Sequence, residues 1–182
     1  MPTTYPTEWP YFFTATNLNW LPILQHDERK NIIIDSLRYL RLNKIIRLHA
    51  FVIMTNHIHL IWQPMTGYTK EKMQFLFMKY TAQQIKFHLE VNDHLLYLQC
   101  LVNKKDRKFQ IWKRKPLSIE LFTPAVYQQK IEYILNNPVK AGLSKYAEEY
   151  KYSSARFYYD GKDEFDLFSG WDLYNPPFDA RS

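Results

Sequence analysis

The feature that most constrains the fold is a pair of apolar runs with almost no connection between them. RLHAFVIM (residues 47–54) and HIHLIWQ (residues 57–63) are separated by only Thr55 and Asn56. Both runs are rich in β-branched and aromatic side chains, which favour strands, and a two-residue connection suits a tight hairpin. The segment therefore predicts two adjacent antiparallel strands.

Helical and strand-like segments flank this hairpin on both sides. In chain order we expect a strand at 11–18, a helix at 27–44, the hairpin strands, a helix at 69–91, a strand at 109–112 and a helix at 123–137. The order strand, helix, strand, strand, helix, strand is that of a ferredoxin-like (RRM-like) split βαβ sandwich. The fold class is therefore α+β, with an antiparallel sheet and an added C-terminal helix.

Length and composition indicate one packed domain over residues 1–182, with a core at about 9–145. Hydrophobic residues make up 46% of the chain, and four residues are glycine. The aromatic tail at 146–182 is expected to wrap the core with little regular structure. Cys100 is the single cysteine, which excludes an intrachain disulfide and a cysteine-based zinc site.

Charge and hydropathy bear on partners and location. The formal net charge is +6 and the sequence pI is about 9.2, which favours a polyanion such as nucleic acid. The N-terminal MPTTYPTEWPYFF does not resemble a signal peptide, and no segment reaches the roughly 18 apolar residues of a membrane span. We expect a cytoplasmic protein without a membrane partner.

Two histidines interrupt the second apolar run. Side chains alternate on a strand, so His57 and His59 point to the same face, about 7 Å apart along the strand. Two imidazoles at that spacing can bind a divalent metal if a third ligand comes from elsewhere. The same spacing more often reflects two half-buried histidines that bond to neighbouring side chains or water and bind no metal.

The last predicted helix carries a polar face as well as an apolar one. Thr123 is a suitable N-cap, and Asn137 with the proline that follows marks the expected helix end. Tyr133 and Asn137 lie four residues apart on one side. Lys130 and Lys140 lie nearby. The apolar stripe on the other side consists of Tyr127, Ile131, Ile134 and Leu135.

This polar face has two interpretations. An exposed tyrosine on an amphipathic helix is common and needs no function. Alternatively, Tyr133 is a nucleophile held beside a metal ligand, with the amide oxygen of Asn137 as the missing third ligand.

Basic residues gather around the predicted strand at 109–112. Such runs are usually solvated charge, but next to Trp112 we expect phosphate contacts, which position a strand without reading its sequence. Ser153 and Ser154 are expected to satisfy backbone groups in a turn. The candidate DNA-contacting residues are Lys104, Lys105, Arg107, Lys113, Arg114, Lys130, Lys140 and Arg156.

Several of these segments resemble one family. MTNHIHLIW resembles the His-hydrophobe-His (HUH) motif of the single-tyrosine endonucleases. YILNNPVKAGL followed by YKYSSARFY is similar to the catalytic-helix and tail region of the REP-associated tyrosine transposases. The similarity runs from WPYFFTATN through IWKRKPLSIELFTP to about Tyr158. Thr55 departs from the pattern, since many relatives have proline there.

The resemblance implies cleavage and rejoining of single-stranded DNA, often at a hairpin, through a 5′-phosphotyrosine intermediate. It assigns the nucleophile to Tyr133 and the Mg²⁺ or Mn²⁺ ligands to His57, His59 and Asn137. Relatives include active and domesticated copies, and both monomers and homodimers.

Two alternative functions are kept open. The chain could be a non-catalytic, domesticated DNA- or RNA-binding module that retains the ferredoxin-like sheet. It could also be a relaxase-like or replication-initiator-like nickase, which shares the site but serves another pathway. An intact set of His57, His59, Tyr133 and Asn137 argues against the first of these.

Overall fold

The computed structural model describes residues 8–168. Its helices are α1 (Asp27–Leu42), α2 (Lys70–Asn92), α3 (His94–Gln99), α4 (Pro124–Lys140) and α5 (Ala155–Asp160), with short 3-10 turns η1 (Leu18–Trp20) and η2 (Ala147–Glu149). Its strands are β1 (Tyr11–Thr16), β2 (Ile46–Ile53), β3 (His57–Pro64) and β4 (Leu117–Glu120).

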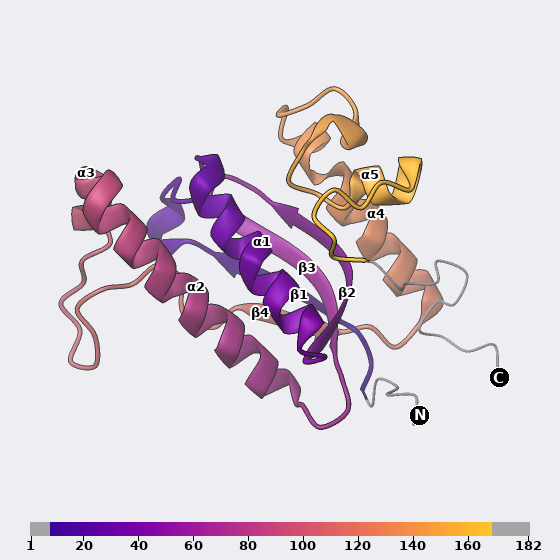
Figure 1. The fold of residues 1–182 in the computed structure, drawn as a ribbon, viewed down its shortest axis with the longest axis horizontal. Helices are drawn as coiled ribbons and strands as arrows, with labels where there is room; N and C mark the ends of the chain where they lie inside the picture. Colours follow the sequence, from indigo (N-terminus) through magenta and orange to yellow (C-terminus); the bar gives the residue numbers. More distant parts are fainter. Residues whose placement is uncertain (1–7, 169–182) are drawn as a thin grey trace.

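The four strands form one antiparallel sheet in the order β2-β3-β1-β4 (Figure 1). This order, with α1 between β1 and β2 and α2 between β3 and β4, is the predicted ferredoxin-like arrangement. The predicted hairpin is also present, because the Met54 amide donates to the His57 carbonyl across Thr55 and Asn56.

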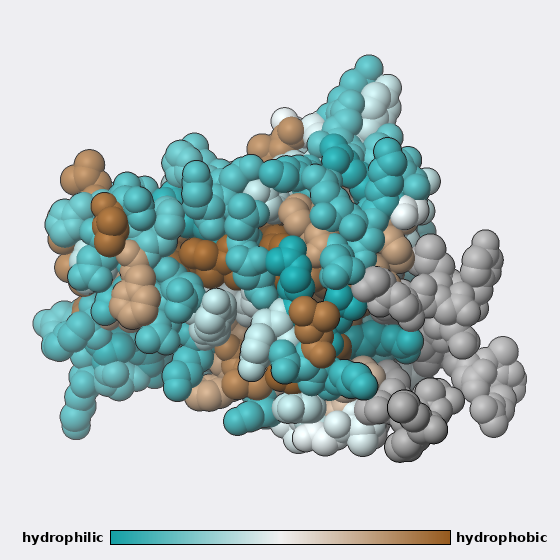
Figure 2. Space-filling model, in the orientation of Figure 1, coloured by the Kyte–Doolittle hydropathy of each residue, from teal (hydrophilic) through white to brown (hydrophobic). Residues whose placement is uncertain are grey.

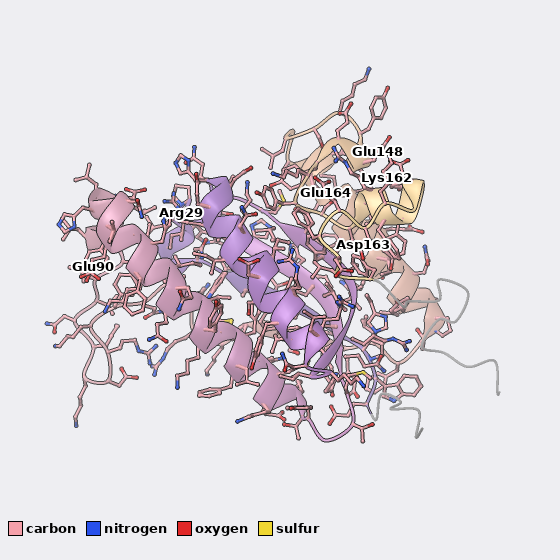
Figure 3. The ribbon with its side chains drawn as sticks, in the orientation of Figure 1. Arg29, Glu90, Glu148, Lys162, Asp163 and Glu164 are labelled. Atoms are coloured by element: carbon pink, nitrogen blue, oxygen red, sulfur yellow. The ribbon has the colours of Figure 1, made fainter. Side chains whose placement is uncertain are left out.

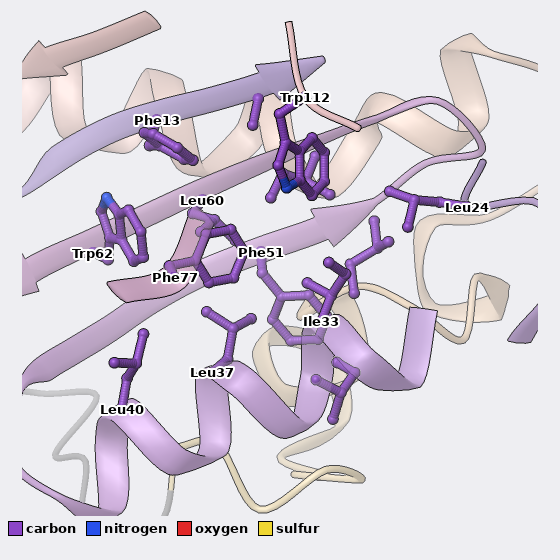
Figure 4. Packing of buried hydrophobic residues seen from close by; sticks show 14 of the residues in the cluster. Phe13, Leu24, Ile33, Leu37, Leu40, Phe51, Leu60, Trp62, Phe77 and Trp112 are labelled. Carbon is purple, nitrogen blue, oxygen red and sulfur yellow. The ribbon is translucent and has the colours of Figure 1, made fainter. Parts of the chain in front are cut away.

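One face of the sheet is covered by α1 and α2, which enclose the larger part of the core (Figure 1). Every second residue of a strand points to this face. Figure 4 shows Phe13, Leu60 and Trp62 of the sheet packed with Leu37 of α1 and Phe77 of α2. All five side chains are fully buried. Burial of this apolar area is the main stabilising contribution on this face.

The opposite face is covered in part by α4, which packs on β2 and β3. The predicted apolar stripe of α4 is confirmed, because all four of its residues are buried. The part of this face around Thr14 and Thr16 of β1 is not covered by α4, and these two residues line a pocket there. The packed residues are Phe12, Ala50, Val52 and Ile61 from the sheet and Tyr127, Ile131, Ile134 and Leu135 from α4.

A β-bulge in β2 turns His49 toward α4. The pairing of β2 with β3 shifts register between Leu48 and Ala50, so His49 is the extra residue of the bulge. The Gln63 amide donates to the Glu8 carbonyl, so its oxygen faces His49 and accepts from Nε2–H at 3.0 Å. His49 Nδ1 therefore accepts the Tyr127 hydroxyl proton at 2.8 Å. This buried chain of hydrogen bonds ties α4 to the sheet.

The prediction of a strand at 109–112 is wrong. The fourth strand is β4, which lies beside β1 with Ile119 opposite Phe12. Phe109 and Trp112 form only isolated bridges. Trp112 instead turns into the core beneath α2, where its indole N–H donates to Thr81 Oγ1 at 3.0 Å. The aromatic residues that suggested a strand belong to an irregular segment, in which Trp112 is buried in the core and Phe109 packs half-buried against it.

Helix α4 extends further than predicted, past Pro138 to Lys140. A proline inside a helix removes one N–H donor, but here the side chain is buried and the helix continues for one more half-turn. Gly142 follows with a φ of 70°, which a glycine adopts without strain. The extension places Lys140 on the same side as Tyr133 and Asn137.

The segment after α4 lies along the β2 edge of the sheet. The Ile53 amide donates to the Tyr152 carbonyl, and the Ser154 amide donates to the Phe51 carbonyl, both at 2.9 Å. The Ser153 hydroxyl donates to the Tyr150 carbonyl, as expected for a turn, whereas the Ser154 hydroxyl donates to the Phe51 carbonyl of β2. These bonds satisfy groups that an open edge would expose to other chains.

The prediction of little regular structure in the tail is wrong for η2 and α5. Arg156 of α5 donates to the Glu148 carbonyl at 2.9 Å and pairs with Glu164 at 2.7 Å. Both acidic residues lie around α5 in Figure 3. The part of the tail at 169–182 lies outside the described residues.

The surface over α1 and α2 is mostly hydrophilic, with hydrophobic side chains near α3 (Figure 2). The most exposed of these are Val91 and Leu95. Among residues 8–168, no helix has the length and apolar character that crossing a membrane requires.

The buried His49 should make stability depend on pH. Burial lowers the pKa of His49 from 6.5 to about 3, so the unfolded chain binds a proton that the folded chain does not. Stability should therefore fall as the pH drops from 6.5 toward 3. The free energy of unfolding of a His49→Gln variant should depend less steeply on pH. Between pH 4 and 6 its slope should be smaller than that of the wild type by about 1.4 kcal/mol per pH unit.

Urea unfolding at a series of pH values measures both slopes. Above pH 7 the two curves should run parallel, because the imidazole is neutral in both states. Parallel curves between pH 4 and 6 would contradict the prediction.

Candidate active site

A pocket of about 440 Å³ opens between the sheet and α4. It lies where α4 leaves the β1 part of the sheet uncovered. Its lining carries hydroxyl, imidazole, phenol, amide and ammonium groups, and the faces of aromatic rings form part of its walls. The lining residues are Thr14, Thr16, Trp20, His57, His59, Tyr133, Asn137, Lys140 and Ala141.

Strand β3 brings the two histidines together on the pocket side. His57 and His59 alternate with Ile58 and Leu60, which are fully buried on the other face. The two imidazole rings lie with their centroids 4.9 Å apart. The shared face predicted from the strand period is confirmed.

The side chain of Asn56 determines the tautomer of His57. Its Nδ2 lies 3.4 Å from the Trp20 carbonyl, which can only accept, so the amide oxygen faces the imidazole. The Nδ1 of His57 lies 2.8 Å from that oxygen and therefore carries the proton. A neutral His57 then has its lone pair on Nε2, the atom that can bind a metal.

His59 is held from the neighbouring strand. Its Nδ1 lies 2.7 Å from the Thr14 hydroxyl, and its ring stacks on Phe12 with centroids 5.5 Å apart. Burial, with smaller effects from the nearby His57 and Lys130, lowers the pKa of His59 to about 3. Only 5% of His59 is exposed, so an uncompensated charge there would be costly.

The pKa of His57 is also lowered by burial, and a hydrogen bond with the Asn137 side chain partly offsets this effect. Both imidazoles are therefore neutral at pH 7. Neutral imidazole is the form that binds metals, because the protonated ring has no free lone pair.

Helix α4 supplies the other half of the pocket. Tyr133 and Asn137 are one helical turn apart and lie on the side away from the apolar stripe. The Tyr133 ring meets the rings of His59 and Phe12 edge-on, with centroids 5.2 and 5.8 Å apart. The exposed fraction of Tyr133 is 37%, so the phenol is accessible from the pocket opening.

Two lysines give this part of the pocket a positive charge. Lys130 Nζ lies 5.6 Å from the centre of the Tyr133 ring, and Lys140 Nζ lies 5.9 Å from it. Lys130 also lies over the ring of Phe12 at 4.7 Å. The ammonium groups favour an anion such as a phosphate at this position.

The remaining basic candidates do not line the pocket. Lys113 is joined to the pocket through its backbone amide, which donates to the carbonyl of Thr16 at 2.7 Å. Arg107 and Arg114 both pair with Asp106. Lys104 and Lys105 belong to the same exposed loop as Arg107. The guanidinium of Arg156 is bonded to the Glu148 carbonyl and to Glu164, as described above.

Sequence reasoning missed five residues of the site, which are Asn56 and the pocket-lining Thr14, Thr16, Trp20 and Ala141. Asn56 could have been found, because it directly precedes His57 and an amide there can reach the Nδ1 of the ring. Thr14 and Trp20 carry no local signal. Their place in the pocket depends on the pairing of β1 with β3 and on the turn that follows β1.

The donor set of the pocket fits a divalent metal of borderline hardness. Within residues 8–168, no three His, Cys, Asp or Glu side chains gather at one point. The pocket offers two neutral imidazoles instead, each with Nδ1 engaged by a neighbouring side chain, and the amide of Asn137 beside His57. This mixture of nitrogen and oxygen donors suits Mn²⁺ and, with water, Mg²⁺.

Comparison with solved structures identifies the architecture. The structure is similar to that of a REP-associated tyrosine transposase bound to a REP hairpin, with a TM-score of 0.61 and 16% sequence identity. The match covers 98% of this chain and 93% of the other. The chain has the fold of a tyrosine transposase. Similarity to this family was the expectation from the sequence motifs, and the fold bears it out.

A second solved structure is less similar. It is a Deinococcus radiodurans protein named as a transposase, with a TM-score of 0.46 and 14% identity over 75% of this chain and 97% of the other. No protein-family model and no curated protein matches the chain.

The protonation of the two histidines can be measured directly. Correlation of imidazole carbons and nitrogens by NMR should show His57 protonated on Nδ1 and titrating below pH 6.5, and His59 titrating near pH 3. The physical cause is burial, which disfavours the charged ring. His57→Gln and His59→Gln variants assign the signals. A proton on Nε2 of neutral His57, or a titration of His59 at 6.5, would contradict this geometry.

Proposed function

We propose that the chain is a metal-dependent, single-stranded DNA endonuclease and transesterase that cleaves and rejoins DNA through Tyr133. One observation carries the proposal. The Tyr133 ring lies 5.2 Å from the His59 ring, in one pocket with His57, Asn137 and Lys140. A pure binding module requires no phenol beside two neutral imidazoles.

The reaction exchanges one phosphodiester for another. The Tyr133 oxygen attacks phosphorus and loses its proton. The bond from phosphorus to the 3′ oxygen breaks, and that oxygen gains a proton to leave as a 3′-OH. The product is a 5′-phosphotyrosine, which a 3′-OH of another strand can attack in the reverse sense. The bond energy is kept, so no nucleotide cofactor is needed.

His57, His59 and Asn137 would hold Mg²⁺ or Mn²⁺, which when bound polarises the scissile phosphate and stabilises the charge that develops on the leaving oxygen. The protein positions these three groups before substrate arrives. Asn56 and Thr14 orient the imidazoles, and burial keeps both rings neutral. Rigidly placed groups of this kind need no reorganisation during the reaction.

Lys130 and Lys140 would complete the electrostatic arrangement. Their ammonium groups lie 5.6 and 5.9 Å from the centre of the Tyr133 ring, close to the place where the phenol oxygen would attack the phosphate. A positive charge at this point stabilises both the nucleophile in its reactive form and the phosphate oxygens.

The substrate is proposed to be single-stranded or hairpin DNA. The solved relative with the similar fold is bound to a REP hairpin. In this chain, the backbone amide of Lys113 bonds to the carbonyl of Thr16, which lines the pocket, and the basic loop with Lys104, Lys105 and Arg107 precedes Lys113 in the chain. Phosphates along a strand that leaves the pocket would be neutralised there.

Covalent capture tests the nucleophile. The protein is incubated with Mn²⁺ and a pool of labelled hairpin oligonucleotides, then denatured and separated by electrophoresis. We expect a slow, protease-sensitive band for the wild type and no band for Tyr133→Phe, because phenylalanine has no oxygen to form the linkage. Chelation of the metal should abolish the band.

Tyr159→Phe is the matched control, since Tyr159 is an exposed tyrosine on α5, at 58% exposure, outside the pocket. It should give the wild-type band. A band that survives Tyr133→Phe, or no band with any oligonucleotide, would refute the proposal. Tight binding without a band would favour the non-catalytic module.

Metal binding tests the ligand set separately from cleavage. Titration with Mn²⁺ followed by electron paramagnetic resonance should show one site, whose affinity falls at least tenfold in His57→Ala, His59→Ala and Asn137→Ala. Asn136→Ala is the control, because Asn136 neighbours Asn137 but bonds to the Glu132 carbonyl. Equal affinity of the Asn136 and Asn137 variants would remove Asn137 from the ligand set.

A further inference from the structure

We infer that Trp20 is a stacking platform for a nucleobase adjacent to the phosphate held in the pocket. The inference rests on the proposed function for the identity of the ligand, a single nucleic-acid strand. It adds a residue and a contact that the sequence motifs do not contain.

Trp20 combines exposure with a place in the pocket wall. Its exposed fraction is 59%, which is high for a tryptophan, yet it lines the pocket with His57 and His59. Its indole lies 6.2 Å from the His57 ring, centre to centre. A large aromatic surface is therefore presented to solvent beside the candidate metal ligands.

The backbone at Trp20 adopts a strained conformation. Asn19 and Trp20 have φ values of 50° and 59°, a conformation that non-glycine residues rarely adopt. Two such residues in succession persist only where the surroundings hold them, and they gather at functional sites. The bonds that hold this turn include Leu18 N–H to the Ile111 carbonyl at 2.7 Å and Asn17 N–H to the Asn56 carbonyl at 2.8 Å.

Asn56 couples this turn to the histidines. The same side-chain amide donates to the Trp20 carbonyl and accepts from His57 Nδ1. The position of Trp20 and the orientation of His57 are therefore set together. A rigid indole loses little conformational entropy when a base stacks on it, which increases the net gain from stacking.

Other residues of the pocket complete the arrangement. Tyr133 and Lys140 of α4, and Ala141 just after it, line the same pocket as Trp20. A strand whose base lies on Trp20 has its neighbouring phosphate directed toward the imidazoles and the Lys140 ammonium. Stacking uses the π-face that every base has, so this contact tolerates any sequence.

Binding to two strands of equal length separates stacking from charge. Fluorescence anisotropy is measured with a labelled strand of 15 deoxyadenosines and with a fully abasic strand that carries the same phosphates. The measurements are made in the Tyr133→Phe background, so that no covalent step contributes. The variants are Trp20→Ala, Trp20→Leu and Trp20→Phe, with the unchanged background as reference.

Trp20→Ala and Trp20→Leu should weaken binding of the deoxyadenosine strand by roughly 5- to 100-fold and change binding of the abasic strand by less than about twofold. Trp20→Phe should retain most of the affinity because it keeps a ring. Tyr39→Ala is the matched control. Tyr39 is 62% exposed on α1, on the other side of the sheet, and its loss should affect neither strand.

An equal loss for both strands would overturn the inference, because it would show that Trp20 only supports the pocket. An unchanged affinity for the deoxyadenosine strand would overturn it as well. The outcome is independent of the cleavage proposal. A stacking contribution without covalent capture by the wild type would refute cleavage alone, and capture without any Trp20 effect would refute stacking alone.

Discussion

The packing of α4 against β2 and β3 is the interaction on which the candidate site depends. Ile131 and Ile134 are buried against the sheet, and Tyr127 bonds to the buried His49. Because the helix has 3.6 residues per turn, fixing this stripe also fixes Tyr133 and Asn137 on the adjacent side. The distance between phenol and imidazoles is therefore a consequence of helix packing.

Burial has two effects in this structure. It stabilises the fold through the apolar residues on both faces of the sheet, and it lowers the pKa of His59 and His57. The second effect prepares two neutral nitrogen donors in a region that also carries two ammonium groups. A pocket with these properties combines a positive charge, which favours anions, with two unprotonated imidazoles.

Local periodicity explains which predictions succeeded. The period of two placed His57 and His59 on one face, and the period of 3.6 separated the apolar stripe of α4 from Tyr133. The strand at 109–112 failed because an aromatic run is equally suited to a core segment, and pairing with β1 decides between them. The helix end at Pro138 failed because burial of the proline ring outweighs one lost hydrogen bond.

The sequence by itself determined the hairpin, the first three strands, the long helices and the candidate residues of the site, because each depends on neighbours within one or two turns of chain. Only the tertiary structure decided that β3 and α4 meet at one pocket, and that Thr14, Trp20 and Asn56 complete it. Apart from the bond between the neighbours Asn56 and His57, those contacts join residues that lie far apart in the sequence: Asn56 and Trp20 are 36 positions apart, and Thr14 and His59 are 45. Their geometry is set by strand pairing and packing, which no local pattern specifies.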